Sequence, residues 1–333
     1  MLQILRKIAF PFSLIYGMVV YLRNLMYDKG LLTSVSYETP TICVGNLSVG
    51  GTGKTPMTEY LLRMLEHHRV AVLSRGYKRK SKGFVLAMSQ SNVLDLGDEP
   101  YQLHRKFPSV SVAVDADRRN GMEQLEQYVK PEVIVLDDAF QHRRVKPTFS
   151  LLLTAYDHLY AGDWYLPTGN LRDAKKEAHR ADVIIVTKCP VGLTLSDRKA
   201  VMAKLKPKSH QKVLFASLRY ADEVTDGKGN HMLLQALQDK DVALVTGIAS
   251  PEPLLRHLTT MGIKVLHYEF GDHHDFTEKD IQKFSGHDLV LTTEKDFVRL
   301  EGKVQHLFYL EVSHYFTPED HTELEKSIKG LLH

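Results

Sequence analysis

The sequence predicts an α/β fold built on a mainly parallel sheet. Short apolar runs recur along the chain and alternate with segments of helical periodicity, which is the pattern of strand–helix–strand units. At 333 residues the chain is long enough for one large domain or two medium ones. With 43% hydrophobic and 25% charged residues, its composition is that of an ordinary globular protein.

The first part of the chain contains most of the predicted strands. The candidates are Thr41–Val44, Val70–Leu73, Val110–Val114, Val133–Leu136, Ser150–Leu153, Val183–Val186 and Leu214–Ser217. Between them, Met57–His67 and Arg118–Tyr128 have helical periodicity.

A second α/β pattern begins after residue 230. The region from Ala216 to Asn230 is polar and turn-rich, which indicates a domain boundary near residue 220. The strands expected after it are Val242–Val245, Val265–Tyr268, Leu289–Thr292 and Leu307–Leu310, with helices over Pro253–Met261 and Glu278–Phe284. We therefore expect a larger domain over residues 31–220 and a smaller α/β lobe over residues 221–333.

The N-terminal segment Ile8–Leu22 carries no charged residue. It is shorter than the ~20 residues that a membrane-spanning helix needs, and no small-residue cleavage site follows it. We expect residues 1–30 to form a helix in the membrane interface, with Tyr16, Tyr21 and Tyr27 as amphipathic anchors. A buried core helix is the alternative interpretation.

Charge and cysteine usage narrow the possible partners. A net charge of +3 gives no strong overall field, so the composition does not indicate a nucleic-acid partner. The two cysteines, Cys43 and Cys189, lack metal-ligand spacing, which is typical of a protein in a reducing cytoplasm. Nothing in the sequence indicates an obligate protein partner.

A glycine-rich loop follows the first candidate strand. It nearly matches the P-loop pattern G-x-x-x-x-G-K-[ST], with Ser48 in the place of the first glycine. Glycines turn backbone N–H groups toward phosphates, Lys54 would reach the β- and γ-phosphates, and the Thr55 hydroxyl would bind Mg²⁺. The residues expected to bind ATP are Ser48, Val49, Gly50, Gly51, Thr52, Gly53, Lys54 and Thr55.

Two positions narrow the class of nucleotide-binding protein. Val49 stands where partitioning and metal-insertion ATPases have a signature lysine, which argues against that class. Val186-Thr187-Lys188-Cys189 resembles the TKxD element that reads guanine in GTPases, but Cys189 replaces its aspartate. The sequence therefore favours ATP over GTP.

The apolar strand Val133–Leu136 ends in two carboxylates, Asp137 and Asp138. This is the Walker B arrangement, in which a carboxylate at the strand end helps to hold Mg²⁺ opposite Thr55. Because successive strand residues point to opposite sides, one of the two aspartates should lie nearer the metal, and either can be that residue.

Two further groups carry side chains suited to proton transfer, Gly97-Asp98-Glu99-Pro100 and Asp272-His273-His274. A kinase must place an acceptor hydroxyl in line with the γ-phosphate and take its proton, and a carboxylate oriented by an imidazole suits that task. Asp98 is equally well explained as a helix N-cap. The histidines are alternatively explained as metal ligands or as part of a solvated loop.

Basic side chains follow several predicted strand ends of the first domain. Arginines at the carboxyl ends of parallel strands indicate an anionic substrate, or stabilisation of the charge on a transferring phosphoryl group. The run Lys78–Lys80 is better explained as a solvated surface. The candidates for substrate binding are Arg75, Arg119, Gln141, His142, Arg143 and Arg172.

Taken together, these motifs resemble those of the tetraacyldisaccharide 4'-kinase family, the lipid A 4'-kinases. The resemblance runs from the N-terminal apolar segment to about residue 300. It is carried, in order, by Ser48–Thr55, Ser74-Arg75-Gly76-Tyr77, Gly97-Asp98-Glu99-Pro100, Leu136–Arg143, Asp272-His273-His274 and Thr293-Glu294-Lys295-Asp296.

The resemblance implies a P-loop NTPase-like α/β/α sandwich with a second, smaller α/β lobe and an N-terminal membrane-interface helix. The implied reaction moves the γ-phosphate of ATP, with Mg²⁺, to the 4'-hydroxyl of the lipid A disaccharide 1-phosphate precursor, which gives lipid IVA. The protein would sit peripherally on the cytoplasmic face of the bacterial inner membrane. Asp98 matches the base, with His273 as its partner and Lys54 as the third catalytic residue. We expect ATP and acceptor to draw the lobes together about a hinge near residue 220.

The chain departs from the family pattern at two positions. Ala139 stands where family members often have glycine, and Asp173 where they often have glutamate, so a metal role is not carried over to Asp173. Two other classes remain as alternatives. One is a P-loop phosphotransferase that acts on a soluble metabolite, and the other is a P-loop switch protein that hydrolyses nucleotide.

Overall fold

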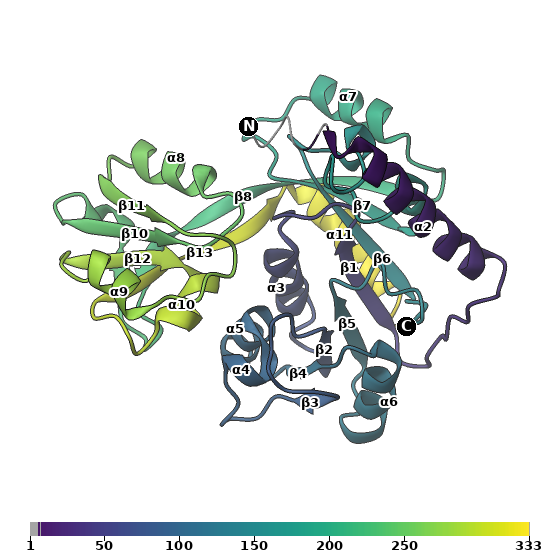
Figure 1. Cartoon of the computed structure of the whole chain (residues 1–333), viewed down its shortest axis with the longest axis horizontal. Helices are drawn as coiled ribbons and strands as arrows, with labels where there is room; N and C mark the ends of the chain where they lie inside the picture. The colour runs from purple at the N-terminus through teal and green to yellow at the C-terminus, as the bar shows by residue number, and fades with distance from the viewer. Residues whose placement is uncertain (1–5, 7, 333) are drawn as a thin grey trace.

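The computed structural model describes residue 6 and residues 8–332. In this part of the chain, thirteen strands form one continuous sheet in the order β11-β10-β12-β13-β8-β7-β6-β1-β5-β2-β4-β3, with β9 added beside β8. Two lobes lie at the two ends of the sheet, and β8 and β13 run between them (Figure 1). The predicted α/β fold with a second, smaller lobe is confirmed.

The first lobe is a parallel sheet with helices on both faces. Its strands are β1 (Thr41–Asn46), β2 (Val70–Ser74), β4 (Ser111–Val114), β5 (Val133–Asp137), β6 (Phe149–Ala155) and β7 (Val183–Thr187), with the short antiparallel β3 (Val85–Leu86) at the edge. One face carries α3 (Lys54–Met64), α5 (Asp98–Lys106) and α11 (Pro318–Lys329), and the other carries α6 (Arg118–Tyr128) and α7 (Leu195–Leu205). The short elements α4 (Val93–Leu96), η1 (Tyr160–Gly162) and η2 (Lys175–Arg180) lie in the connections.

These strands form because their apolar runs are buried on both faces of the sheet. Strands β1, β2, β5, β6 and β7 are buried at every residue, as parallel strands between two helix layers must be. The positions predicted for these strands are therefore confirmed, with ends that differ by one or two residues, whereas the candidate Leu214–Ser217 is part of a longer strand, Lys212–Thr225.

The second lobe repeats this arrangement on a smaller scale. Its strands are β9 (His231–Leu233), β10 (Val242–Thr246), β11 (Val265–Glu269) and β12 (Leu289–Thr293). Helix α8 (Glu252–Thr260) and η3 (Leu234–Leu237) cover one face, and α9 (Glu278–Phe284) and α10 (Glu294–Leu300) cover the other.

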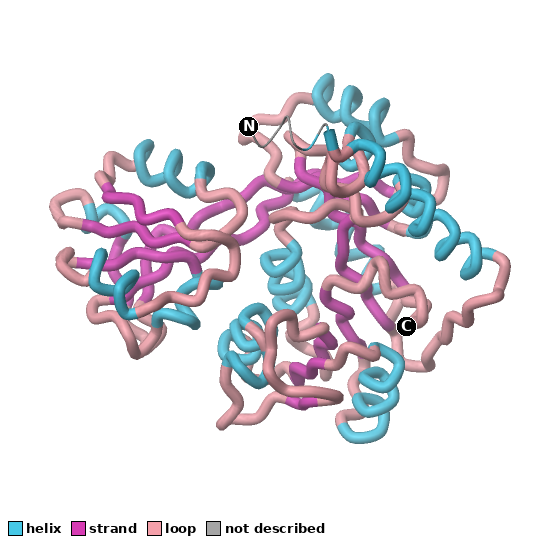
Figure 2. Tube along the Cα trace, viewed as in Figure 1, coloured by secondary structure: helices cyan, strands magenta, loops and turns pink. Residues whose placement is uncertain are grey.

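The two lobes are joined by a ribbon of two antiparallel strands, β8 (Lys212–Thr225) and β13 (Leu307–Phe316). Figure 2 shows the two strands crossing the gap together. The region 216–230, expected to be turn-rich, is strand as far as Thr225, so the boundary predicted near residue 220 falls inside β8. The segment is polar because much of the ribbon between the lobes is partly or fully exposed, and such a strand needs no continuous apolar run.

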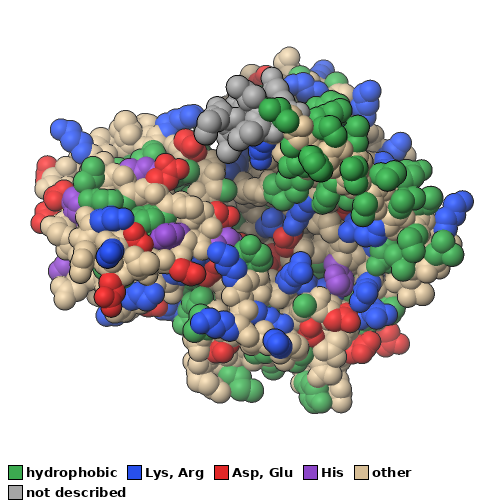
Figure 3. All heavy atoms as spheres, in the orientation of Figure 1, with side chains coloured by type: hydrophobic (Ala, Val, Ile, Leu, Met, Phe, Trp, Pro, Cys, Tyr) green, Lys and Arg blue, Asp and Glu red, His purple; other side chains and the backbone are tan. Residues whose placement is uncertain are grey.

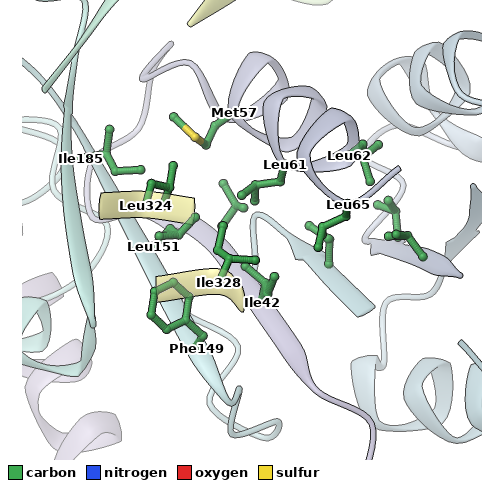
Figure 4. Close-up of a cluster of buried hydrophobic side chains, with 14 of the residues drawn as sticks. Ile42, Met57, Leu61, Leu62, Leu65, Phe149, Leu151, Ile185, Leu324 and Ile328 are labelled. Atoms are coloured by element: carbon green, nitrogen blue, oxygen red, sulfur yellow. The ribbon is translucent and has the colours of Figure 1, made fainter. Parts of the chain in front are cut away.

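The end of the described chain returns to the first lobe. Leu324 and Ile328 of α11 are buried against Ile42 and Leu61 in the first-lobe core (Figure 4). The expectation that residues 221–333 form one lobe is therefore wrong for this segment. The second lobe is instead an insertion between β8 and the end of β13.

The N-terminal helix α2 (Phe10–Asp28) has the reverse of the usual amphipathic arrangement. Its buried residues are the small or polar Ser13, Gly17 and Asn24, together with Val20. The large apolar residues are exposed: Phe12 by 66%, Leu14 by 58%, Ile15 by 56%, Met18 by 57% and Val19 by 58%. They form an apolar surface over α2 (Figure 3). The alternative of a buried core helix is therefore wrong. Residues 1–5 and 7 of the predicted segment lie outside the described residues.

Polar contacts hold the inner face of α2 on the first lobe. Asn24 donates to the Asp173 carboxylate at 2.7 Å, and the Ser13 hydroxyl donates to Thr168 at 2.8 Å. Tyr16, expected to be an interfacial anchor, instead turns inward and donates to the Arg172 carbonyl at 3.1 Å. Tyr21 stays half-exposed beside the Lys176 ammonium. None of the helices in the described ranges is both long and apolar enough to cross a bilayer.

Candidate active site

The phosphate loop runs from the end of β1 to the start of α3, which begins at Lys54. Gly50 and Gly53 have φ angles of 108° and 85°, a conformation that favours glycine. The start of the loop is held by backbone bonds, because the Val49 N–H donates to Asn170 at 2.7 Å and the Arg172 N–H donates to Leu47 at 2.8 Å. Because α3 begins at Lys54, its N-terminus follows the loop directly, as a phosphate site requires.

The two aspartates after β5 have different surroundings. Arg172 contacts both carboxylate oxygens of Asp138, and the Lys54 Nζ lies 3.8 Å from one of them. Burial opposes ionisation of Asp138, but Lys54 and Arg172 hold its pKa below the ordinary value. Asp137 accepts from the hydroxyls of Ser74 at 3.0 Å and Thr58 at 3.4 Å.

Burial raises the pKa of Asp137 to about 7, and the charges of Glu99 and Asp138 add to the shift. This crowding of carboxylates in a buried place is what a bound cation relieves. The Thr55 hydroxyl and the oxygens of Asp137 and Asp138 are hard donors that suit Mg²⁺, so these residues fit the ion. Glu99, which follows Asp98 in the Gly97–Pro100 motif, also belongs to this acidic group, because its charge acts on Asp137.

Asp98 and His273 meet across the two lobes. The His273 Nδ1 lies 2.7 Å from Asp98 Oδ2, although the two residues are 175 positions apart. The Lys295 ammonium lies 3.0 Å from the other ring nitrogen, Nε2. An ammonium only donates, so Nε2 accepts from Lys295, and a neutral ring then carries its proton on Nδ1, beside both Asp98 and the Arg299 guanidinium at 2.9 Å.

The alternatives for these two groups do not hold. The N-cap of α5 is Gly97, and Asp98 makes no capping bond because its side chain is directed to the second lobe. His274 points away from His273, pairs with Asp280 at 3.0 Å and stacks on Phe270. The adjacent histidines therefore do not converge on one ion.

Arg299 is the cation that holds Asp98. Its Nε donates to Asp98 Oδ1 at 2.9 Å, a terminal nitrogen contacts Oδ2, and the other donates to the His274 carbonyl at 3.1 Å. Burial opposes ionisation of Asp98, but the hydrogen bonds from His273 and Arg299 hold its pKa well below the ordinary value. Sequence reasoning missed Arg299. The available signal was its place four residues after Lys295, on the same face of α10.

Two of the predicted substrate residues lie at the phosphate loop. Arg172 joins Asp138 to the side chain of Asn46, and Gln141 donates to the Asn46 carbonyl at 2.6 Å. His142 is half-buried. Burial is the main cause that lowers its pKa to about 4, and the charge of Arg118 adds to the shift, so the ring is neutral.

The two adjacent arginines after β4 are placed differently. Arg118 is only 2% exposed, and Asp137 and Asp138 stabilise its charge against burial. Arg119, the residue predicted from the sequence, reaches only Asp117 at 4.0 Å. Arg75 is exposed, and its charge acts on both Arg118 and His142. The sequence prediction therefore selected Arg119, whereas it is the neighbouring Arg118 that faces the acidic pair.

Arg143 does not have the position expected of a substrate residue. Its guanidinium is engaged by Asp28 at 2.7 Å, by Glu177 at 3.3 Å and by the Asn24 carbonyl at 3.1 Å. It also covers the ring of Tyr27. Arg143 therefore secures the end of α2, and the buried Asp173 does the same through Asn24.

The comparisons with known proteins identify the family of the chain. A curated relative from Flavobacterium johnsoniae, named tetraacyldisaccharide 4'-kinase, is 48% identical over 95% of this chain and 94% of its own length. A relative of the same name from Bacteroides thetaiotaomicron is 48% identical over 89% of this chain and 83% of its own length. The crystal structure of "apo" form LpxK from Aquifex aeolicus in complex with ATP superposes with a TM-score of 0.80 at 31% identity, covering 99% of this chain and all of that one. The sequence model of the LpxK family, described as tetraacyldisaccharide-1-P 4'-kinase, matches residues 5–332, beyond the expected limit near residue 300. The chain therefore belongs to the tetraacyldisaccharide-1-P 4'-kinase family.

Proposed function

We propose that the protein transfers the γ-phosphate of ATP to the 4'-hydroxyl of a tetraacyldisaccharide 1-phosphate, and so makes lipid IVA. The observation that carries this is the contact of Asp98 with His273 across the lobes, in a chain that also has a phosphate loop and an acidic pair. A switch protein that only hydrolyses nucleotide has no use for such a pair. The names of the relatives support the lipid acceptor.

Lys54 and the loop Ser48–Thr55 would bind the phosphates of ATP. Thr55, Asp137 and Asp138 would hold Mg²⁺, which when bound neutralises charge on the transferring phosphoryl group. We place Asp137 nearer the ion, because Asp138 is already paired with the cation Arg172, whereas Asp137 accepts only from the neutral hydroxyls of Ser74 and Thr58. Arg75, Arg119, Gln141, His142 and Arg172 remain the residues that we propose for the anionic acceptor or the transferring phosphoryl group, and Arg118 joins them.

Asp98 would accept the proton of the 4'-hydroxyl. Its lowered pKa keeps the carboxylate ionised at neutral pH, which is the form that can accept a proton. Arg299 keeps the carboxylate ionised, and His273 orients it from the second lobe. We further propose that ATP and acceptor draw the lobes closer about β8 and β13, which solution scattering with and without ligands would detect.

The apolar side of α2 would lie in the cytoplasmic face of the inner membrane. A helix that faces its polar side inward and its large apolar side outward is suited to the membrane interface. An acceptor with four acyl chains resides in the same layer, so the enzyme would meet it there.

One transfer assay tests the proposal. Labelled ATP, Mg²⁺ and the lipid disaccharide in mixed micelles should give labelled lipid. Label that appears only as free phosphate would identify a hydrolysing switch, and label on a soluble alcohol alone would identify another phosphotransferase.

Vesicle binding tests the membrane surface. Replacing Ile15 and Val19 with aspartate should weaken sedimentation with anionic vesicles roughly tenfold for each change, since each places a charge in the interface. The matched control is Val191→Asp, which alters an apolar residue that is 94% exposed outside α2 and should have no effect. Equal losses in both variants would contradict the assignment.

A further inference from the structure

The phosphate loop has one contact that comes from the strand between the lobes. The Nε2 atom of His314, on β13, lies 2.9 Å from the carbonyl oxygen of Gly53. A carbonyl only accepts, so the imidazole donates from Nε2. His314 is 4% exposed, and burial lowers its pKa to about 4, so the ring is neutral and its single proton is at Nε2.

The absence of a side chain at Gly53 leaves room for this ring. Gly53 lies directly before Lys54, has a φ of 85°, and acts as the N-cap of α3 without a side chain. A Cβ added at this position would stand 2.8 Å from His314 Nε2. The imidazole therefore lies against the loop at the place where the chain turns into the helix that carries Lys54 and Thr55.

The neighbouring carbonyl of the loop, that of Thr52, is held from within the first lobe. The Thr187 hydroxyl, at the end of β7, donates to the Thr52 carbonyl at 2.8 Å. Adjacent carbonyls of the loop are thus held by a donor from β7 and a donor from β13. Two fixed carbonyls orient the peptide groups between them, and with them the N–H groups that face a phosphate.

Strand β13 links the position of His314 to both lobes. Leu310 lies in the core of the second lobe and Phe316 in the core of the first. Between them His314 pairs with Leu218 of β8, and Glu311 binds Lys106 of the first lobe at 2.8 Å. The donor to Gly53 is therefore on a strand that is packed into the second lobe at Leu310 and into the first lobe at Phe316.

We propose that His314 is a positioning residue, which holds the Gly53 carbonyl and through it the phosphate loop in the shape that binds the phosphates of ATP. The inference rests on the proposed function, because it requires that this loop binds ATP. It gives β13, the last strand along the chain, a role in the nucleotide site that the sequence motif of the loop does not reveal.

Two amide variants separate the hydrogen bond from the volume of the ring. In His314→Gln the side-chain amide can reach the place of Nε2, whereas in His314→Asn it reaches only the place of Nδ1. Calorimetry with ATP and Mg²⁺, without acceptor, should give a Kd about fivefold weaker for His314→Asn and within twofold of wild type for His314→Gln. The KM for ATP should follow the Kd, while kcat at saturating ATP stays within twofold.

Equal ATP affinity in wild type and His314→Asn would overturn the inference, and so would a His314→Gln protein as weak as His314→Asn. Thermal unfolding of the free variants checks that each is folded. If the asparagine variant is not, ¹⁵N NMR of the wild-type imidazole decides, because a proton on Nδ1 at neutral pH would exclude the proposed bond. A wild-type protein that does not bind ATP would overturn the proposed function instead.

Discussion

The nucleotide half and the acceptor half of the site are built in different ways. The phosphate loop and the acidic pair come from β1 and β5, which are neighbours in one sheet. Asp98 is completed by His273 and Arg299, which are 175 and 201 positions away and belong to the other lobe. The first half is thus a property of one lobe. The second half exists only while the lobes are in contact.

Asp98→Asn should separate the two halves most strongly. Loss of the carboxylate should lower kcat/KM about 10²- to 10⁴-fold, the usual contribution of a general base, with little change in the Kd for ATP. Lys54→Met, by contrast, should lower the rate of transfer and also weaken ATP binding. Transfer rates and calorimetry on both variants make the comparison, and an Asp98→Asn protein that no longer binds ATP would show that the halves are not independent.

Arg299→Leu should show what the buried cation contributes. It leaves the Asp98 carboxylate without its cation, which should cost about 3–5 kcal/mol of unfolding free energy at pH 7. The folded-state pKa of Asp98 is lowered, so its stabilisation is present above its unfolded pKa of about 3.9 and is lost as the pH falls through the folded value. Urea unfolding at pH 7 and pH 3 should therefore show a smaller difference between the proteins at pH 3.

The matched control is Arg105→Leu, which breaks the more exposed pair with Glu301 across the same interface. Its cost should be about 1 kcal/mol or less. Equal costs for the two arginines would mean that Asp98 is not the reason for the effect of Arg299.

Asp137→Asn tests the nucleotide half. The folded-state pKa of Asp137 is raised to about 7. The contribution of this carboxyl to the free energy of unfolding is therefore fully present below its unfolded pKa of about 3.9, and it is lost as the pH rises through the folded pKa of about 7. Without Mg²⁺ at pH 8 the variant should be more stable than wild type by about 2 kcal/mol. Adding Mg²⁺ should stabilise wild type more at pH 8 than at pH 6 and should leave the variant nearly unchanged. If Mg²⁺ raised the unfolding temperature of wild type and of Asp137→Asn equally, Asp137 would not be a ligand of the ion.

His274→Ala should have the smallest effect. This ring packs on Phe270 and pairs with Asp280, away from Asp98, so kcat/KM should fall no more than about threefold. His273→Ala should lose about a hundredfold or more. Similar losses for both histidines would mean that the whole turn, rather than His273 alone, forms the acceptor half.

The first lobe could be predicted closely from the sequence, and the ribbon could not. Strands such as β5 are buried on both faces and therefore appear as continuous apolar runs. Strand β8 is partly exposed along much of its length, so its polar residues were interpreted as turns. Helix α11 was not predicted at all, and its return to the first lobe is a long-range contact that local patterns do not contain.

The site follows the same division. The proposed nucleotide-site residues follow one another within the loop and within the acidic pair, so local spacing is enough to predict them. Arg299, Arg118 and His314 act through contacts that form only when distant segments meet. Arg143 shows the converse error, because a basic residue after a strand end was assigned to substrate although it secures α2.

The place of α11 also sets the order in which the molecule can be assembled. Synthesis of the chain completes the second lobe before α11. During that time the core of the first lobe lacks the residues that α11 contributes to it. Until Leu324 and Ile328 arrive, the apolar surfaces of Ile42 and Leu61 lack their cover. The second lobe has its own hydrophobic cores and can fold first. The core beneath the phosphate-loop helix is therefore completed only after the second lobe has been synthesised, although the loop itself is made early.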